Sequence, residues 1–386
     1  MQKLPPPPCI SMTRATVALF LPSVHGGGAE RAMLNFGEQL LKRGYAVTLI
    51  VANMEGALQK LIPTEMKVVN LRSDRMIRAL PRLVRWLRAT PPDAIFSTIT
   101  HANLVAACAA RFTGLSSRMV VRQSNAPLSE RKVTLGRVLS HRLIPYVYRW
   151  TRGIIAVSDG VRAELTAMDS ALADRIQVLP TPVLTEELAA QGEAIPHHPW
   201  FIDRRVPVIV SAGRLVEHKG MLDLIRAFAL IRSHREARLI IIGEGSFRQT
   251  LEDEVTRLGL RDDVSLPGFQ HNPFSYMNHA SVFVLASHYE GLPNVLIQAM
   301  SFGTPIVATD CRSGPAEILE GGRLGRLVPV MDVPALARAI EESLLLPKQR
   351  KAQARAWERF GAGEATSRYL WMAGLPAKQT EEIRRE

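Results

Sequence analysis

Two cations in one loop have the types and spacing expected of a diphosphate-binding site. Arg214 and Lys219 lie five residues apart, between an expected strand at 208–211 and an expected helix at 221–231. A guanidinium fork and a lysine ammonium at this spacing can hold the two phosphates of a diphosphate. The types and spacing of these two cations therefore predict a phosphate clamp. A solvated basic turn without a ligand is the alternative, and it stays open.

A second segment, residues 288–300, follows an expected strand at 282–286 and starts a helix near Pro293. Proline is pre-organised for the first helical turn, and the first N–H groups of a helix have no partner within it. These groups then face the end of the strand, where ligands bind open α/β sheets. The donors expected there belong to Gly291, Leu292 and Asn294.

Two polar side chains of the same segment complete the predicted site. Glu290 offers a carboxylate that can accept hydrogen bonds from sugar hydroxyls, and Gln298 lies one or two helical turns further on. A lone glutamate at this position could also simply complement the helix dipole. The unpaired amides and nearby cations favour the binding interpretation.

Glycines at 26–28 separate an expected strand at 17–21 from an expected helix at 29–43. Gly27 would let the backbone approach a phosphate at the helix N-terminus. A tight turn without a ligand is the alternative. An NAD-dependent oxidoreductase would need a third glycine where Arg31 stands and an acidic residue after the second strand, which ends in Ala52-Asn53. The dinucleotide interpretation is therefore disfavoured.

His101 follows the expected strand 94–97 and should face the same cleft. A polar residue in a first helical turn is the alternative. The cysteines, Cys9, Cys108 and Cys311, are far apart and lack metal-ligand spacing, so no metal site is predicted.

Strand and helix patterns alternate along the chain, which favours an α/β fold with parallel sheets. The pattern lapses in a proline-rich stretch and then restarts, so two Rossmann-like domains facing a central cleft are predicted. The expected ranges are a disordered tail at 1–13, a first domain at 14–185, a linker at 186–206, a second domain at 207–365, and a C-terminal helix at 366–386 that packs back on the first domain.

These motifs together resemble glycosyltransferase family four, the retaining group 1 glycosyltransferases with the GT-B fold. The resemblance covers most of residues 15–370. It is carried by GGGAER at 26–31, VSDGVR at 157–162, SAGRLVEHKG at 211–220, IIGEGSFRQTLE at 241–252 and EGLPNVLIQAMSFGTPIVATDCRSGPAEIL at 290–319.

The resemblance implies sugar transfer from a nucleotide diphosphate sugar without a required metal or other cofactor. Arg214 and Lys219 would bind the donor pyrophosphate, Glu290 the donor sugar, and Gly27 the donor phosphate from the first domain. His101 would contact the acceptor or donor sugar. The family usually has a second glutamate where Gln298 stands, commonly on the nucleotide ribose, and often asparagine at Thr181. An amide keeps hydrogen bonding but loses the charge-assisted bond.

Charge is distributed unevenly along the chain. Residues 1–185 hold 24 Lys and Arg against 11 Asp and Glu, whereas residues 186–386 hold 24 against 25. A basic half indicates an anionic partner. One predicted helical face carries Arg75, Arg78, Arg82, Arg85 and Arg88, interrupted by Pro81, and a second stretch at 131–152 mixes basic with aromatic residues. Without a nucleic-acid-binding fingerprint, an anionic membrane surface is the expected partner, although solvated faces over a core would look alike.

The expected function is transfer of a hexose or N-acetylhexosamine from a UDP or GDP donor to a lipid-linked or surface-polysaccharide acceptor. No segment has the length of a spanning helix or the form of a signal peptide, and the few cysteines suit a reducing compartment. A cytoplasmic, peripheral location at the inner membrane face is therefore expected. The alternatives are a catalytically weak sugar-nucleotide-binding assembly protein and, less favoured, the NAD-dependent oxidoreductase.

Overall fold

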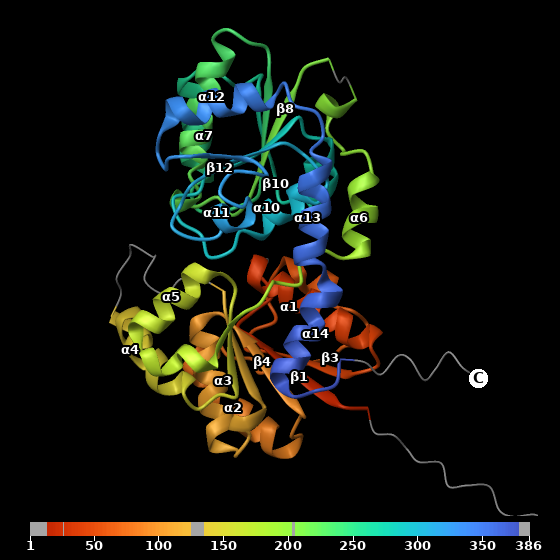
Figure 1. Ribbon diagram of the computed structural model, residues 1–386, viewed down its shortest axis with the longest axis vertical. Helices are drawn as coiled ribbons and strands as arrows, with labels where there is room; N and C mark the ends of the chain where they lie inside the picture. The colour runs from red at the N-terminus through yellow and green to blue at the C-terminus, as the bar shows by residue number, and fades with distance from the viewer. Residues whose placement is uncertain (1–13, 26, 125–134, 203–204, 378–386) are drawn as a thin grey trace, which may run out of the picture.

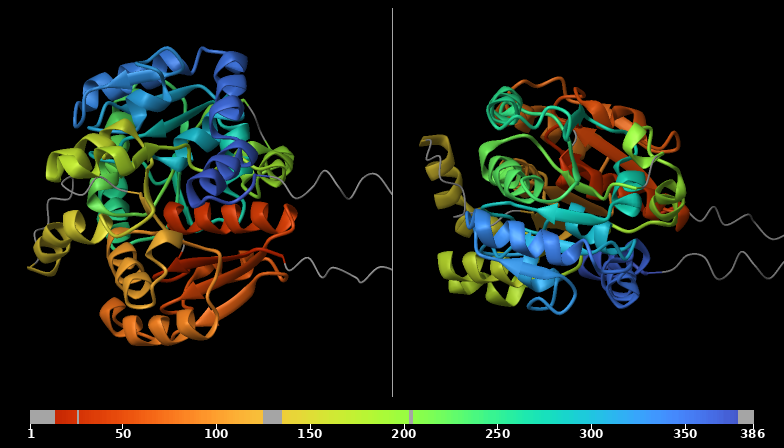
Figure 2. Two further views of the ribbon diagram at one scale, coloured as in Figure 1. Left: turned by 60° about the horizontal axis from the view of Figure 1, so that its bottom comes forward. Right: turned by 90° about the horizontal axis from the view of Figure 1, so that it is seen from above.

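Two α/β domains stack along the long axis of the molecule (Figure 1). The computed structural model describes residues 14–25, 27–124, 135–202 and 205–377, without the side chains of 135–139. The expected tail at 1–13 and residues 378–386 lie outside this description. In Figure 2, α1 (Gly28–Lys42) lies at the boundary between the two domains.

The first domain is a parallel sheet in the order β3-β2-β1-β4-β5-β6-β7. Its strands are β1 (Thr16–Leu21), β2 (Ala46–Val51), β3 (Lys67–Asn70), β4 (Ala94–Thr98), β5 (Met119–Gln123), β6 (Gly153–Ala156) and β7 (Ile176–Val178). The crossover helices after α1 are α2 (Met76–Ala89), α3 (Thr100–Phe112), α4 (Leu135–Tyr148) and α5 (Asp159–Met168). The central strands are apolar and buried, because helices cover both faces of such a sheet.

The second domain repeats this plan with the order β10-β9-β8-β11-β12-β13. Its strands are β8 (Val208–Ala212), β9 (Arg238–Ile242), β10 (Val264–Gly268), β11 (Val282–Leu285), β12 (Ile306–Thr309) and β13 (Arg326–Val328). Its helices are α7 (Met221–Arg232), α8 (Arg248–Arg257), α9 (Pro273–His279), α10 (Asn294–Met300), α11 (Pro315–Ile318), α12 (Val333–Ser343) and α13 (Arg350–Phe360).

Each sheet reverses its strand order at one point, between β1 and β4 in the first domain and between β8 and β11 in the second. At such a point the loops leave a crevice beyond the carboxyl ends of the strands. The segments that follow these four strands carry Gly27, His101 in the first turn of α3, the Arg214–Lys219 pair and Glu290. The topology therefore brings all four predicted segments to the two crevices.

The connection between the domains is more structured than the expected linker at 186–206. It contains α6 (Glu186–Glu193), capped by Thr185, whose hydroxyl accepts a hydrogen bond from the Leu188 amide at 3.2 Å. The prolines and glycine around this short helix obscure its period. The chain crosses back beside the first crossing, where the Ala362 amide donates to the Leu184 carbonyl at 2.8 Å.

The last described helix, α14 (Ala362–Ala373), packs on the first domain (Figure 1). Tyr369 and Leu370 are fully buried in the same core cluster as β1 and α1. The helix begins four residues before the expected start at 366, because Gly361 ends α13 and opens α14 directly.

Candidate active site

Lys219 and Glu290 form an ion pair at the crevice of the second domain. The Lys219 Nζ lies 2.6 Å from Glu290 Oε1, and the Ser287 hydroxyl donates to the same oxygen at 2.7 Å. The Ser313 hydroxyl donates to the Glu290 carbonyl at 2.8 Å. Glu290 is thus fixed by the loops after β8, β11 and β12 and has little rotational freedom left.

The loops that carry this pair are joined at several points. The His288 amide donates to the His218 carbonyl at 2.8 Å, and the His218 and Tyr289 rings stack at 4.4 Å between centroids. His288 Nε2 lies 2.7 Å from an Asp223 carboxylate oxygen. Gly220 has φ +63°, and a Cβ there would lie 1.9 Å from the Ala286 carbonyl oxygen, so only glycine permits this approach.

The stacked histidine is uncharged at neutral pH. Burial lowers the pKa of His218 to about 4, and the adjacent Lys219 ammonium acts in the same direction. The ring therefore adds no charge to the site. Lys219 and the exposed Arg214 remain the cations of this loop.

Arg214 makes no side-chain hydrogen bond or ion pair with any residue that the structure describes. The amides of Gly291 and Leu292 likewise donate no hydrogen bond within the described part of the chain, nor does the Asn294 amide at the start of α10. Donors without protein partners at the end of parallel strands can bind an anion. The predicted donor-binding groups are thus placed together, although α10 begins one residue later than expected.

Two predicted residues reach across to the first domain. The Asn294 side-chain nitrogen donates to the Gly28 carbonyl at 2.9 Å, and Leu292 packs against core clusters of both domains. The Asn294 side-chain oxygen is buried and without a partner among described residues. Sequence reasoning assigned only the backbone of these residues, because side-chain contacts between domains leave no local pattern.

Gln298 lies on α10 and is buried, and its side-chain amide has no hydrogen-bond partner among the residues described. Its unused donor and acceptor are compatible with the predicted ligand contact.

Gly27 is the N-cap of α1, which begins one residue earlier than expected, and a first-domain side chain already fills the space that its missing Cβ leaves. A Cβ on Gly27 would lie 2.2 Å from Glu30 Oε2. Glu30 was not predicted as a site residue, although it follows the glycines by two positions. Its signal was an acidic residue in the first turn of the phosphate-loop helix, which usually indicates only dipole stabilisation.

His101 lies in the first turn of α3 with its side chain exposed. Partial desolvation lowers the pKa of its imidazole. The preceding Ile99 has φ +72°, which is strained for a β-branched residue. This strained turn connects β4 directly to the helix and sets where His101 leaves the strand end.

Arg122, at the end of β5, is a second residue that sequence reasoning missed. It is buried, and its guanidinium donates to hydroxyls of Thr98 at 3.0 Å, Thr181 at 2.8 Å and Tyr369 at 3.1 Å. Thr181, at a position where the family often has asparagine, therefore accepts a hydrogen bond from a buried arginine. A lone arginine in the apolar strand 119–123 was the available signal.

At the outer edge of the cleft, Glu317 from α11 caps helix α5 of the other domain. Its carboxylate accepts hydrogen bonds from the Asp159 amide at 2.9 Å and the Gly160 amide at 3.1 Å. Carboxylates are favourable at helix N-termini. The second domain thus contacts the VSDGVR segment directly.

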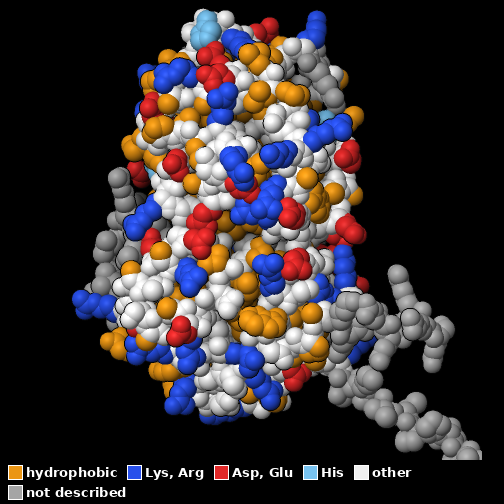
Figure 3. Space-filling model, in the orientation of Figure 1, with side chains coloured by type: hydrophobic (Ala, Val, Ile, Leu, Met, Phe, Trp, Pro, Cys, Tyr) orange, Lys and Arg blue, Asp and Glu red, His pale blue; other side chains and the backbone are white. Residues whose placement is uncertain are grey.

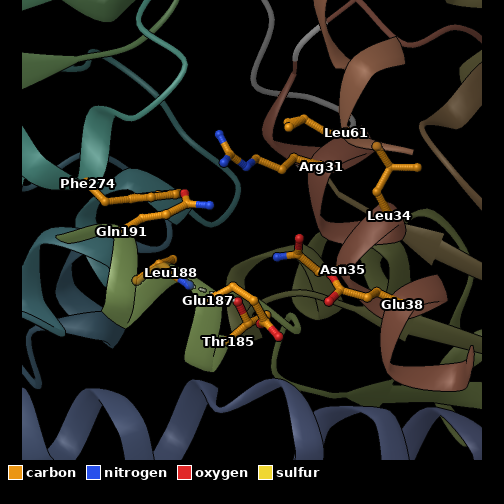
Figure 4. Close-up of a pocket in the computed structure, with 10 residues that line it drawn as sticks. All are labelled: Arg31, Leu34, Asn35, Glu38, Leu61, Thr185, Glu187, Leu188, Gln191 and Phe274. Atoms are coloured by element: carbon orange, nitrogen blue, oxygen red, sulfur yellow. Dashed lines mark hydrogen bonds between the residues drawn. The ribbon is translucent and has the colours of Figure 1, made fainter. Parts of the chain in front are cut away.

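A pocket of about 100 Å³ lies beside the connection between domains and away from the clamp (Figure 4). In it the Arg31 guanidinium lies 4.7 Å from the Phe274 ring centroid. Lys42, which pairs with both Glu38 and Glu187, joins α1 to α6 nearby. The Lys219–Glu290 pair is not part of its lining, so we do not place donor chemistry there.

Two family models match consecutive parts of the chain. The model described as Glycosyltransferase Family 4 matches residues 26–187, and the model described as Glycosyl transferases group 1 matches residues 197–359. Together they span both domains.

Individual relatives agree with this assignment. The chain is 26% identical over 374 residues, 92% of its length and 99% of the relative, to N-acetylgalactosamine-N,N'-diacetylbacillosaminyl-diphospho-undecaprenol 4-alpha-N-acetylgalactosaminyltransferase of Campylobacter jejuni. It is 26% identical over 252 residues to an uncharacterized glycosyltransferase of Methanocaldococcus jannaschii, covering 64% of this chain and 62% of that relative.

The fold is also shared with a solved structure. Anabaena HepE in complex with UDP-glucose superposes with a TM-score of 0.80 at 20% identity, over 93% of this chain and 99% of that one. Because the models match both domains and the arrangement of sheets is the same, the chain belongs to the family four, or group 1, glycosyltransferases with the GT-B fold.

Proposed function

We propose that the enzyme transfers a hexose or N-acetylhexosamine, with retention and without a metal, from a UDP- or GDP-sugar to a lipid-linked or surface-polysaccharide acceptor. The observation that carries the proposal is the Lys219–Glu290 pair, with the unpartnered Arg214 in the same loop as Lys219, at the crevice of the second sheet. A nucleotide diphosphate sugar has the anionic and hydroxyl groups that these side chains bind.

The charges support a transition state in which the diphosphate leaves. Arg214, Lys219 and the unpartnered amides before α10 would neutralise the negative charge that develops on the leaving phosphate. Glu290, fixed by Lys219 and Ser287, would hold a donor-sugar hydroxyl. The departing phosphate would then take the proton of the acceptor hydroxyl on the same face of the sugar, and His101 would contact one of the two sugars.

The acceptor proposal draws on the Campylobacter relative, whose name specifies a sugar linked to diphospho-undecaprenol and which aligns over nearly its whole length. A lipid-linked acceptor has to be reached at a membrane. We therefore propose that the first domain binds the inner membrane surface as a peripheral protein.

The surface of the first domain supports this placement in part. The four arginines of α2 and its N-cap residue Arg75 are all exposed, and the helix continues through Pro81. Figure 3 shows Lys and Arg side chains gathered at the lower end of this domain. However, Leu83 and Leu87 are buried in the core and Trp86 packs against it, so Ile77 is the one large apolar side chain of α2 that is exposed.

Helix α4 offers further apolar groups. Leu143, Tyr146 and Trp150 are exposed, with Tyr146 at 66%. They lie within eight residues of one another at the end of α4. Aromatic residues suit the boundary between headgroups and acyl chains. No described helix is long and apolar enough to cross a bilayer.

Donor hydrolysis without acceptor tests the proposed activity. We expect slow release of UDP or GDP from one of UDP-glucose, UDP-N-acetylglucosamine, UDP-N-acetylgalactosamine and GDP-mannose, unchanged by a chelator. A protein that binds nucleotide but releases none, with or without extracts containing lipid-linked sugars, would support the assembly-protein alternative, which the glutamine at 298 motivates. Binding of none of these donors would contradict both.

A further inference from the structure

Glu30 is a buried carboxylate of the first domain to which the proposed chemistry gives no role. Its side chain is only 7% exposed and folds over Gly27, inside the turn of the glycine loop. No hydrogen bond from another side chain and no ion pair reaches it from the described residues. A buried carboxylate without a paired cation is costly, which is the signature of a group kept for function.

The charges that act on Glu30 come from three other segments. They are His25 in the loop after β1, Arg122 on β5, and Arg214 across the cleft in the second domain. Arg122 is bonded to three hydroxyls, so its guanidinium is occupied. Arg214 is a cation of the proposed clamp. Glu30 and a bound diphosphate would therefore lie near the same guanidinium.

A bound diphosphate and an ionised Glu30 carboxylate would repel each other near Arg214, and this repulsion costs free energy. A negative charge close to a carboxylate favours its protonated form, most strongly where water is excluded. If the Glu30 side chain turned away from the diphosphate instead, it would lose its present position over Gly27 in the first turn of α1. Taking a proton needs no movement and converts the carboxylate into a hydrogen-bond donor.

We propose that Glu30 is a donor-binding residue that takes up one proton when the nucleotide diphosphate binds, and then donates a hydrogen bond to a phosphate oxygen. The proton comes from solvent, joins a carboxylate oxygen, and returns to solvent when the nucleoside diphosphate leaves. No bond of the donor is broken in this step. The inference rests on the proposed function, because it requires the diphosphate at Arg214.

The resting site already makes protonation of Glu30 easier than in water. Burial raises the pKa of Glu30 above its ordinary value, against the opposing effects of a backbone hydrogen bond and of Arg214, His25 and Arg122. Bound diphosphate shifts the same equilibrium further in that direction. Affinity of the wild-type enzyme should therefore fall as pH rises from the pKa of Glu30 in the free enzyme to its higher pKa in the complex.

Titration calorimetry of UDP and GDP measures the proton directly. Each nucleotide is titrated at pH 8 in two buffers of different ionisation enthalpy, and again at pH 6. We expect Glu30→Gln to take up about one proton fewer per nucleotide than wild type at pH 8. Because glutamine mimics the protonated acid, the variant should bind more tightly than wild type at pH 8, by about tenfold for each unit by which that pH exceeds the pKa of Glu30 in the free enzyme, and this advantage should shrink at pH 6.

Two further variants separate this role from a structural one. Glu38→Gln makes the same change on the same helix, at the Lys42 ion pair, and should leave proton uptake and affinity as in wild type. Glu30→Asp keeps an ionisable group and should keep part of the uptake. A purely structural glutamate would lower affinity at both pH values when changed to Gln, without altering the proton count.

The possible failures can be told apart. Unchanged proton uptake in Glu30→Gln, with UDP or GDP still bound, overturns this inference and leaves the proposed function intact. Absence of binding of either nucleotide to the wild type overturns the proposed function, and this inference with it.

Discussion

Glu290 reaches the cleft already oriented, because one of its oxygens accepts hydrogen bonds from both Lys219 and Ser287. Its other oxygen is the one that can bind a sugar hydroxyl. Fixing a carboxylate in this way means that its contribution is present without rearrangement when the donor binds.

Glu290→Gln should therefore lose most turnover, by about a hundredfold or more, because it removes a preorganised charge and the partner of Lys219. The melting temperature should fall little, since the side chain lies at the cleft. Donor turnover and thermal unfolding are the measurements. A variant with full turnover would show that Glu290 does not act on the donor.

Gln298→Glu is the complementary change. The glutamine has no hydrogen-bond partner in the described structure, so a carboxylate there displaces no protein contact. We expect donor affinity to be kept or raised by up to about tenfold through a charge-assisted bond to the ribose. Weaker donor binding in this variant would place the ribose elsewhere.

Sequence spacing predicts the positions of candidate residues only where their neighbours are local in the chain. Arg214, Lys219 and Glu290 could be found from their spacing beside strand ends. Glu30 and Arg122 could not, because their importance comes from burial by segments distant in the chain: Tyr369 lies 247 residues beyond Arg122. Nor could spacing reveal that Lys219 and Glu290 pair with one another.

At the scale of elements, the two loops after β8 and β11 act as one unit. The His288–Asp223 contact at 2.7 Å and the His218–Tyr289 stack hold Lys219 beside Glu290. Asp223 itself lies in the first turn of α7, outside the ion pair. It is a positioning residue in this account.

Asp223→Asn should lower kcat/KM for the donor by about tenfold or more, since small displacements of a binding group weaken catalysis strongly. The loss should appear mainly in KM, with nucleoside binding preserved. Asp253→Asn on α8, where the partner is Gln249, is the matched control and should change neither. An equal effect of both substitutions would exclude a specific positioning role.

The helices and strands that the sequence predicted correctly are those whose apolar residues recur with a clear helical or strand period. The strands β1, β4, β8 and β11 and the helices α1 and α7 lie within one residue of their predicted bounds. Strands β3, β7 and β13 were missed, because exposed polar residues interrupt them, whereas β11 is just as short but wholly apolar and buried. Helix α6 was missed within a stretch of prolines and polar residues.

At the scale of the whole molecule, the domains meet at both ends of the cleft, through Asn294 on Gly28 and through Glu317 on α5. The uneven charge of the chain becomes an arginine-rich surface on the first domain, far from the donor clamp in the second. That separation would let the acceptor side face a membrane while the donor enters from water.

Vesicle co-sedimentation tests this arrangement. Binding should require anionic lipid and weaken with salt, because each arginine near such a surface contributes about 1 kcal/mol. Changing Arg78 and Arg85 to Gln should reduce binding to anionic vesicles. The double variant Tyr146→Ser, Trp150→Ser should reduce the binding that remains at high salt. Arg82 is a less suitable target, since it donates to the carbonyls of Leu71 and Arg72. Binding to neutral vesicles that ignores salt would contradict the electrostatic account.

Arg214→Ala is the decisive variant for the proposed clamp of Arg214 and Lys219 on the donor diphosphate, because the Arg214 guanidinium makes no hydrogen bond or ion pair with a described residue. Calorimetric titration should show UDP or GDP binding weakened by about tenfold or more, the loss expected for one charge-assisted bond of about 1.5–3 kcal/mol. Uridine or guanosine should bind as to wild type, and Lys351→Ala, an exposed cation on α13, should change neither. Equal losses for the diphosphate and the nucleoside, or no loss for either, would contradict the account.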